Sequence, residues 1–264
     1  MPSSTRSDPV PGRPYVLAEA TWKTVRETPY DVAVLPWGAT EAHNYHLPYG
    51  TDTYQCDYVA AEAARRAWEA GARVIVLPAV PFGVNTGQLD IKLDINMNPS
   101  TQAAILRDVV DVLARQQIPR LVVMNGHGGN HFRQMLRELQ AAFPSVFLCT
   151  LNWYEAADVH AFFDEPGDHA GEMETSAMMH IAPDLVRPLE EAGDGAARSF
   201  RVYGLRQGWV WAQRAWSQVT QDTGVGNPAH ASADKGQRFL DAVATEISRF
   251  LVDLARTDPA DLYG

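Results

Sequence analysis

Four short apolar runs, separated by longer segments of helical period, constrain the fold of this chain most strongly. The runs cover residues 31–37, 73–80, 120–125 and 146–153, and each is almost continuously apolar. Strands that are apolar on both faces are typical of parallel sheets that helices cover on each side. The alternation of strand and helix predicts βαβ units and a layered α/β fold.

The helical segments carry residues that suit helix ends. We expect helices over residues 54–70, 98–117 and 130–142, and a long helix with one apolar face near the C-terminus. Gly71 is placed to end the first helix, because glycine suits the position after a helix. Ser100 and Ser232 are placed to cap the second helix and the last one.

No repeat, low-complexity tract or linker divides the chain, so we interpret residues 1–264 as a single domain. Residues 190–230 are rich in Gly, Trp and Gln and show no clear period. The sequence leaves open whether this stretch is a lid or a contact between subunits.

Charge and composition limit the classes of partner. The formal net charge is −10 and no cluster of Lys and Arg offsets it, which argues against binding to nucleic acid or to an anionic membrane. The first 14 residues contain no apolar signal region, and no run reaches the roughly 18 apolar residues of a membrane span. Cys56 and Cys149 are isolated, as in proteins of a reducing compartment. We therefore expect a cytoplasmic protein.

Histidines and acids gather where the predicted strands end. The segment "ATEAHNYHLPYGTD" follows the first strand, "NGHGGN" follows the third, and "DHAGEMETS" precedes a helical run. In parallel sheets, ligands bind at the carboxyl ends of the strands, so these segments should meet at one edge. Mixed His, Asp and Glu ligands suit Zn²⁺, Mn²⁺ or Fe²⁺. The residues that would meet there are Glu41, His43, Asp52, His127, Asp168, His169, Glu172 and Glu174.

Each segment also has an interpretation without a metal. The glycines of "NGHGGN" could serve a tight turn or cradle a phosphate at a helix N-terminus. The acids of "HAGEMETS" could be the acidic first turn of a helix. The metal hypothesis is favoured because two segments that mix histidine with carboxylate, and a third that carries a histidine, all lie at element boundaries.

The three segments resemble, in the same order, the signatures of the creatininase (creatinine amidohydrolase) family. "GVGNPAHASADKG" at residues 224–236 resembles the family's approach to its last helix, so the resemblance spans about residues 30–255. It implies a three-layer αβα sandwich with a mostly parallel central sheet. It also implies hydrolysis of a C–N bond other than a peptide bond, in a homo-oligomer.

The resemblance implies a dinuclear centre with two divalent metals per chain, zinc first and manganese or iron as alternatives. Glu41, Asp52 and His127 would hold one metal, and His43 and Asp52 the other, with Asp52 as the bridge. His169 matches the catalytic histidine of the family. Two metals that share a carboxylate can activate water and polarise a carbonyl, and a nearby histidine can pass a proton to the leaving nitrogen.

Three departures from the family pattern bear on the substrate and the ligands. Gly129 stands where creatinine-acting members carry a ligating Glu, and residues 160–168 lack the Trp that those members place before the catalytic His. The pair Asn44–Tyr45 replaces a form that contains Gly. The first two departures imply a substrate other than creatinine, and the third bears on the local shape of the pocket. We expect Glu172 to replace the missing carboxylate.

The sequence therefore supports a metal-dependent hydrolase of a small cyclic or linear amide. A catalytically inactive binding or scaffold protein with the same fold is the alternative, and a metal-free phosphate-binding loop is a third. Metal content separates them, because only the hydrolase requires about two metals per chain.

Overall fold

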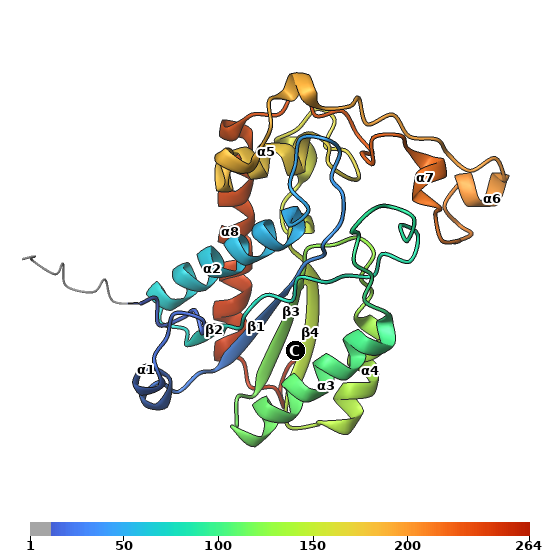
Figure 1. The fold of residues 1–264 in the computed structure, drawn as a ribbon. Coiled ribbons are helices and arrows are strands. Elements are labelled where there is room, and N and C mark those ends of the chain that lie inside the picture. Colours follow the sequence, from blue (N-terminus) through green and yellow to red (C-terminus); the bar gives the residue numbers. More distant parts are fainter. Residues whose placement is uncertain (1–11) are drawn as a thin grey trace, which may run out of the picture.

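The computed structural model describes residues 12–264, and a sheet of four parallel strands lies at its centre (Figure 1). The strands are β1 (Val32–Trp37), β2 (Val74–Val76), β3 (Arg120–Asn125) and β4 (Phe147–Asn152). They lie in the order β2-β1-β3-β4, and each pairing is parallel. All four predicted strands are therefore confirmed.

The second strand is shorter than the apolar run 73–80. Leu77 still donates its backbone N–H to Val34 O at 2.8 Å, but Pro78 has no N–H with which to continue the ladder. An isolated parallel bridge between Trp37 and Val80 follows, shifted by one residue from the β1–β2 register.

Eight α-helices accompany the sheet within residues 12–264. They are α1 (Trp22–Glu27), α2 (Thr51–Glu69), α3 (Pro99–Arg115), α4 (Arg133–Ala142), α5 (Glu172–Ile181), α6 (Tyr203–Arg206), α7 (Trp216–Val219) and α8 (Ala233–Arg256). Single-turn 3₁₀ helices occupy Trp153–Glu155, Val159–Ala161, Pro183–Leu185 and Leu189–Glu191.

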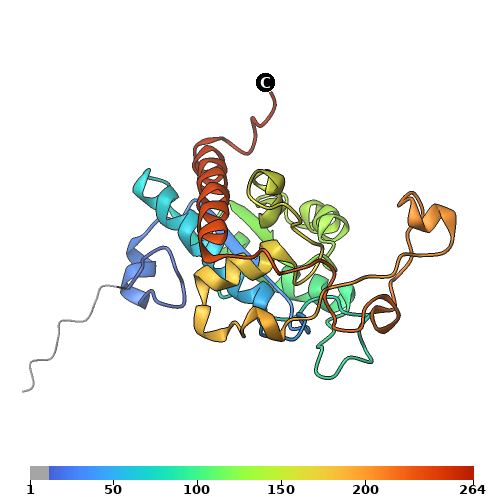
Figure 2. The same cartoon turned by 90° about the horizontal axis from the view of Figure 1, so that it is seen from above.

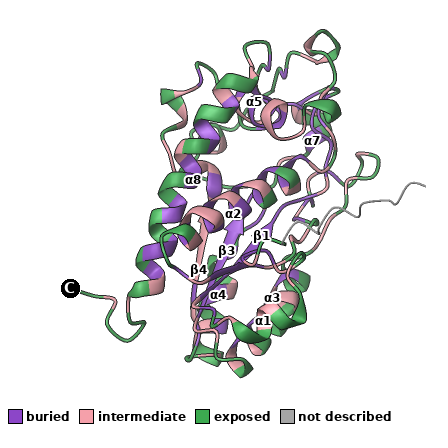
Figure 3. Ribbon diagram, turned by 90° about the vertical axis from the view of Figure 1, so that its left-hand side faces the viewer, coloured by how far each residue is buried: buried purple, intermediate pink, exposed green. Residues whose placement is uncertain are grey.

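The helices cover both faces of the sheet. Alternate side chains of a strand point to opposite faces, so Val32 and Val34 pack with α2 and α8, whereas Ala33 and Leu35 pack with α3 and α4. Figure 2 shows the helices on either side of the strands, and in Figure 3 β1 and β3 are coloured as buried, whereas the long helices carry both buried and exposed residues. The structure confirms a three-layer αβα fold with a parallel sheet.

Two of the predicted helix ends are confirmed and one is wrong. Gly71 follows α2 with a φ of 93°, and the Ser232 hydroxyl accepts a hydrogen bond from Lys235 N at the start of α8. Ser100 is not a cap, because α3 begins at Pro99 with Asn98 as its N-cap. Proline suits the first helical position, where no N–H is needed.

The start of α2 differs from the prediction in a way that concerns the site. The helix begins at Thr51, three residues before the expected start at 54, so Asp52 lies in its first turn. A carboxylate in this place is stabilised by the positive end of the helix dipole.

Residues 200–216, which we call the arm, project from the body and carry α6 (Figures 1 and 2). Val202, Tyr203, Trp209 and Trp211 are exposed on it. Its last residues return to the body, where Trp216 N donates to Gly87 O at 2.9 Å. The arm therefore ends against the loop that follows β2.

Some expectations from composition can be compared with the structure. Cys56 is a buried free thiol and Cys149 a partly buried one. Among residues 12–264, we find no helix with the length and apolarity to cross a bilayer. The expected lack of a signal region rests mainly on residues 1–11, which lie outside the described part of the chain.

Candidate metal centre

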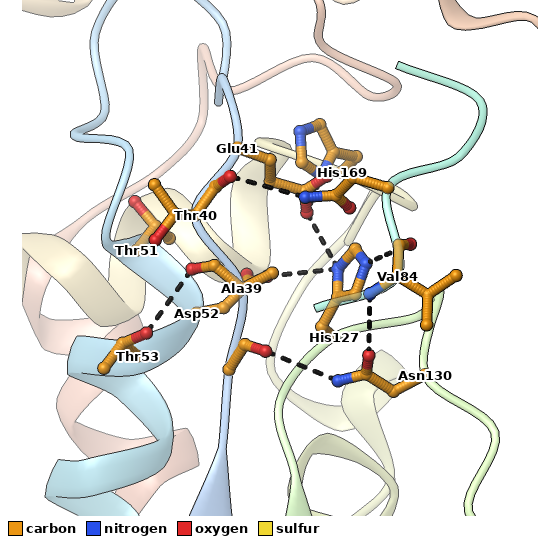
Figure 4. A network of polar contacts seen from close by, with 12 residues as sticks. Ala39, Thr40, Glu41, Thr51, Asp52, Thr53, Val84, His127, Asn130 and His169 are labelled. Carbon is orange, nitrogen blue, oxygen red and sulfur yellow. Dashed lines mark hydrogen bonds and ion pairs between the residues drawn. The ribbon is translucent and has the colours of Figure 1, made fainter. Parts of the chain in front are cut away.

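Six polar side chains from four parts of the chain meet at the carboxyl end of the sheet. They are Glu41 and His43 from the segment after β1, Asp52 from α2, His127 from the segment after β3, and His169 and Glu174 at the start of α5. Figure 4 shows Glu41, Asp52, His127 and His169 turned toward one another. Parallel strands bring their following segments to one edge, as the sequence predicts.

Asp52 lies between two histidines. His43 Nε2 is 3.0 Å from Asp52 Oδ1, and His127 Nδ1 is 3.1 Å from Asp52 Oδ2. Two sets of ligand atoms therefore share this carboxylate, and within each set all atoms lie within 4.8 Å of one another. The first set is Glu41, Asp52 and His127, and the second is His43, Asp52 and Glu174.

Each of the three imidazoles has one nitrogen held by a backbone carbonyl. His43 Nδ1 donates to Glu41 O at 3.0 Å, His127 Nε2 to Val84 O at 3.2 Å, and His169 Nε2 to Ala42 O at 2.8 Å. The other nitrogen of each ring then faces the carboxylates as a lone pair. Metal-binding histidines are usually oriented by such a bond from their second nitrogen.

The carboxylate oxygens of Glu41 and Asp52 that lie near His127 Nδ1 require a cation between them and this nitrogen. Its Nδ1 lies 2.8 Å from Glu41 Oε1 as well as close to Asp52, and Asp52 Oδ2 is buried without a hydrogen bond among residues 12–264. Two carboxylate oxygens and an imidazole lone pair repel one another unless a proton or a metal ion lies between them. The residues present therefore fit a divalent metal.

The charges of the cluster support the same conclusion. Within the described chain, no lysine or arginine forms an ion pair with Glu41, Asp52 or Glu174. Burial alone would lower the pKa of His127, but the charges of Glu41 and Asp52 outweigh it and raise that pKa well above its usual value. Burial is likewise outweighed at His43, where Asp52 raises the pKa to about 10. The carboxylates of the cluster therefore favour a positive charge beside them, either on a histidine or on a metal ion.

Glu172, the expected replacement ligand, is not brought into the cluster. It is fully buried, one carboxylate oxygen pairs with Lys235 Nζ, and the other accepts from Glu165 N at 2.9 Å. Two side chains that are two residues apart on an α-helix are rotated by about 200° about the helix axis, so they lie on nearly opposite sides of the helix. Because Glu174 faces the cluster, Glu172 faces α8 instead.

Glu174 occupies the place that was expected of Glu172. Its Oε2 lies 3.9 Å from His43 Nε2 and accepts from Ala170 N at 2.5 Å. Burial raises the pKa of this carboxyl group, partly offset by His43. The resemblance favoured Glu172 over Glu174, because family members with the other ligand set also carry a Glu at the position of Glu174.

The glycine that replaces the ligating Glu of creatinine-acting members is required by its surroundings. A Cβ at Gly129 would lie 2.3 Å from Val84 O and 2.5 Å from His127 Nε2. A side chain there would break the hydrogen bond that orients His127. The chain therefore cannot place a ligand at 129 without moving the loop after β2.

The Asn44–Tyr45 pair keeps a backbone shape that glycine would also allow. Asn44 has a φ of 55°, in the left-handed region that asparagine tolerates better than most residues. Its side chain accepts from Gly193 N at 2.8 Å. The departure from the Gly-containing form leaves the turn between His43 and His46 intact.

A cavity of about 480 Å³ opens onto the cluster. Its walls include Glu41, Asp52, His127, His169, Glu174, Tyr154, the segment Asn85–Gln88 and the end of the arm from Trp211 to Trp216. Gln88 donates to Glu41 Oε2 at 2.6 Å and fixes that carboxylate. A larger hollow of about 770 Å³ beside α4, β4 and α8 contains none of the clustered residues.

An αβα fold with an imidazole–carboxylate cluster below a cavity is the arrangement of a hydrolase whose residues could hold metal ions. The chain belongs to the creatininase family, because the family model for creatinine amidohydrolase matches residues 18–251. The enzymes of this family are hydrolases that act on C–N bonds, and this chain is one of them.

Two relatives show how the family varies. A protein of Mycolicibacterium smegmatis called mycofactocin precursor peptide peptidase is 28% identical over 79% of this chain and 79% of its own length. The creatinine amidohydrolase of Pseudomonas putida is 29% identical over 72% of this chain and 80% of its own. The first name refers to a peptide and the second to creatinine, a cyclic amide.

Solved structures agree on the fold. A Bacteroides fragilis protein provisionally assigned as a creatinine amidohydrolase is 41% identical, with a TM-score of 0.89 over 94% of this chain and 98% of its own. A manganese form of creatininase has a TM-score of 0.77 at 23% identity over 92% and 99% of the two chains. A mutant creatininase described as the Zn-Zn type has a TM-score of 0.75 at the same identity and coverage. At 23% identity the likeness concerns the fold alone.

Proposed function

We propose that the chain is a dinuclear metal-dependent amidohydrolase that cleaves a C–N bond in a small cyclic or linear amide. The observation that carries the proposal is the position of Asp52, whose two oxygens lie against histidines of two different ligand sets. Glu41, Asp52 and His127 would hold one metal, and His43, Asp52 and Glu174 the other. Glu172 is no longer part of the proposed set.

Two bound divalent metals would supply Lewis acidity for the substrate carbonyl and for a water molecule. The ligand set of His nitrogens and carboxylates suits zinc, with manganese or iron as alternatives. Hydrogen bonds to backbone carbonyls orient the His43 and His127 rings, so that the nitrogens facing the carboxylates would bind the metals in place of protons, and Gln88 holds Glu41 in its orientation.

His169 is placed to move a proton. Its Nδ1 is 3.7 Å from Glu41 Oε1. The centroid of its ring lies 4.1 Å from that of His43 and 5.4 Å from that of Trp216, which it meets edge to face. Because Nε2 donates to Ala42 O, Nδ1 is the nitrogen that can deliver a proton to the leaving amine.

The cavity favours a small amide. Its volume of about 480 Å³ lies within the usual range of small-molecule sites. Gly129 removes the ligand that creatinine-acting members have, so we propose an amide other than creatinine as substrate. The homo-oligomeric state and cytoplasmic location that the sequence predicts are also proposals.

Activity of the loaded protein against a substrate panel tests the proposed function. Protein prepared with zinc, manganese or iron would be assayed on lactams, formamides, cyclic ureas, creatinine and short peptides. We expect hydrolysis of at least one small amide, its loss with a chelator, and its return with added metal. A loaded protein that hydrolyses none of these compounds would support the scaffold alternative, and cleavage of peptides alone would contradict the small-amide assignment.

Replacing His169 tests its role separately from metal binding. We expect His169→Ala to lower kcat by about 10²–10⁴-fold, the usual contribution of general acid–base catalysis. Metal content should stay unchanged, because His169 is not needed to complete either proposed set. Loss of a metal from this variant, measured by elemental analysis, would identify His169 as a ligand instead.

A further inference from the structure

One basic side chain, that of Arg214, lies among the acidic side chains that line the cavity. The lining residues include four carboxylates, those of Glu41, Asp52, Asp168 and Glu174, and Arg214 is the only Lys or Arg among them. Three of these acids belong to the proposed metal site. Arg214 and Asp168 therefore decide the charge of the cavity wall beyond the metals.

Two contacts fix the orientation of the Arg214 guanidinium. It lies over the ring of Trp216, with its central carbon 4.5 Å from the ring centroid, and Nη1 donates to Asp168 Oδ2 at 2.8 Å. Stacking on an aromatic face leaves the edge of a guanidinium open for bidentate hydrogen bonds. No acceptor within residues 12–264 pairs with its Nε or Nη2.

The backbone around Arg214 is fixed against the site. Trp216 N donates to Gly87 O at 2.9 Å, and Thr86 Oγ1 donates to Gln213 Oε1 at 2.9 Å. The arm thus presents Arg214 from a wall that is bonded to the loop after β2. A side chain on such a support can select a ligand, because little order has to be gained on binding.

The ion pair with Asp168 does not occupy the guanidinium fully. The Arg214 side chain is 41% exposed and that of Asp168 is 57% exposed. Exposed ion pairs contribute little free energy, so a carboxylate in the cavity can share or displace Asp168. An arginine fork matches a carboxylate better than any other common group in a small amide.

The spacing fits a short molecule. Trp216 bridges from the guanidinium to the His169 ring, at 4.5 and 5.4 Å, so Arg214 is no farther from His169 than these two steps together. At about 3.5 Å for each amino-acid unit, no more than about three units would span from the His169 ring to this guanidinium.

Resting on the proposed function, we propose that Arg214 makes this site selective for amides that carry a carboxylate within about three amino-acid lengths of the bond that is cleaved. Trp216 and Asp168 orient the guanidinium. Neutral amides of the same size would enter the cavity without this contact.

Calorimetric titration with a matched pair of probes tests the proposal. Zinc-loaded protein would be titrated with N-acetylglycine, which carries a carboxylate, and with N-acetylglycinamide, which is neutral. We expect the anion to bind about 10- to 100-fold more tightly, as a charge-assisted hydrogen bond allows. In Arg214→Gln the ratio should fall to near one, and Arg214→Lys should keep part of it.

Arg206→Gln is the control, because it removes the same charge from the arm at a position outside the cavity. It should keep the wild-type ratio. A preference for the anion that survives in Arg214→Gln would show that the carboxylate binds the metals, and it would overturn the proposal. So would the absence of any preference in the wild type.

The two proposals fail in different ways. A loaded protein that hydrolyses amides of the panel but shows no preference dependent on Arg214 retains the proposed function and contradicts the carboxylate contact. A preference that depends on Arg214, in a protein that hydrolyses nothing, supports the contact and contradicts the proposed function.

Discussion

Asp52→Ala is expected to lose both metals together and to lower kcat/KM for any hydrolysed amide by more than about 10³-fold. Both ligand sets include Asp52, and its two oxygens lie 3.0 and 3.1 Å from His43 Nε2 and His127 Nδ1. Removing it takes one ligand from each site at once. Elemental analysis of protein reloaded with zinc measures the loss directly.

Asp57→Ala is the matched control for Asp52→Ala. It makes the same change on the same helix, at an exposed position outside both ligand sets. Full metal content is expected there. His43→Ala should remove only the metal of the second set, since His43 belongs to that set with Asp52 and Glu174. Unchanged metal content in Asp52→Ala would contradict the dinuclear assignment.

A second large effect is expected from replacing one of the two glutamates at the start of α5, Glu174. Glu174→Gln should weaken the second metal by at least about 10–100-fold, the loss seen even for groups that only support a ligand. The stoichiometry of reloaded protein should fall from about two metals to about one, with activity lost. Equilibrium dialysis with zinc measures both the affinity and the number of sites.

Glu172→Gln is the comparison, because it makes the same substitution two residues away. It should keep both metals, since Glu172 contacts Lys235 and Glu165 N and not the cluster. Its melting temperature should fall, because a partly buried charge pair between α5 and α8 is broken and its buried member is Glu172. Loss of metal from Glu172→Gln, with Glu174→Gln unaffected, would restore the expectation that the sequence alone suggested.

The parallel sheet could be predicted because its strands are apolar on both faces, as in Val32–Leu35 and Leu121–Val123. The gathering of Glu41, His43, Asp52 and His127 followed from the same pattern, since each lies after a parallel strand or at the start of the next helix. These residues depend on topology, which apolar periodicity reveals.

The role of Glu174 depends on the rotation of α5 about its axis, which the sequence did not reveal. Both sides of this helix are buried, with Glu172 toward α8 and Glu174 toward the sheet edge, so no polar face marks its orientation. The part that Arg214 plays in the cavity wall was hidden for another reason. It lies in an aperiodic segment whose position depends on contacts with Thr86 and Gly87.

A crystal structure of the zinc-loaded protein, with anomalous scattering recorded at the zinc edge, tests the dinuclear centre most directly. We expect two peaks about 3.5–4 Å apart. Each should have an Asp52 oxygen about 2.0–2.2 Å away, with Glu41 and His127 around one peak and His43 and Glu174 around the other. A single peak, or two peaks of which one does not contact Asp52, would contradict the bridged site.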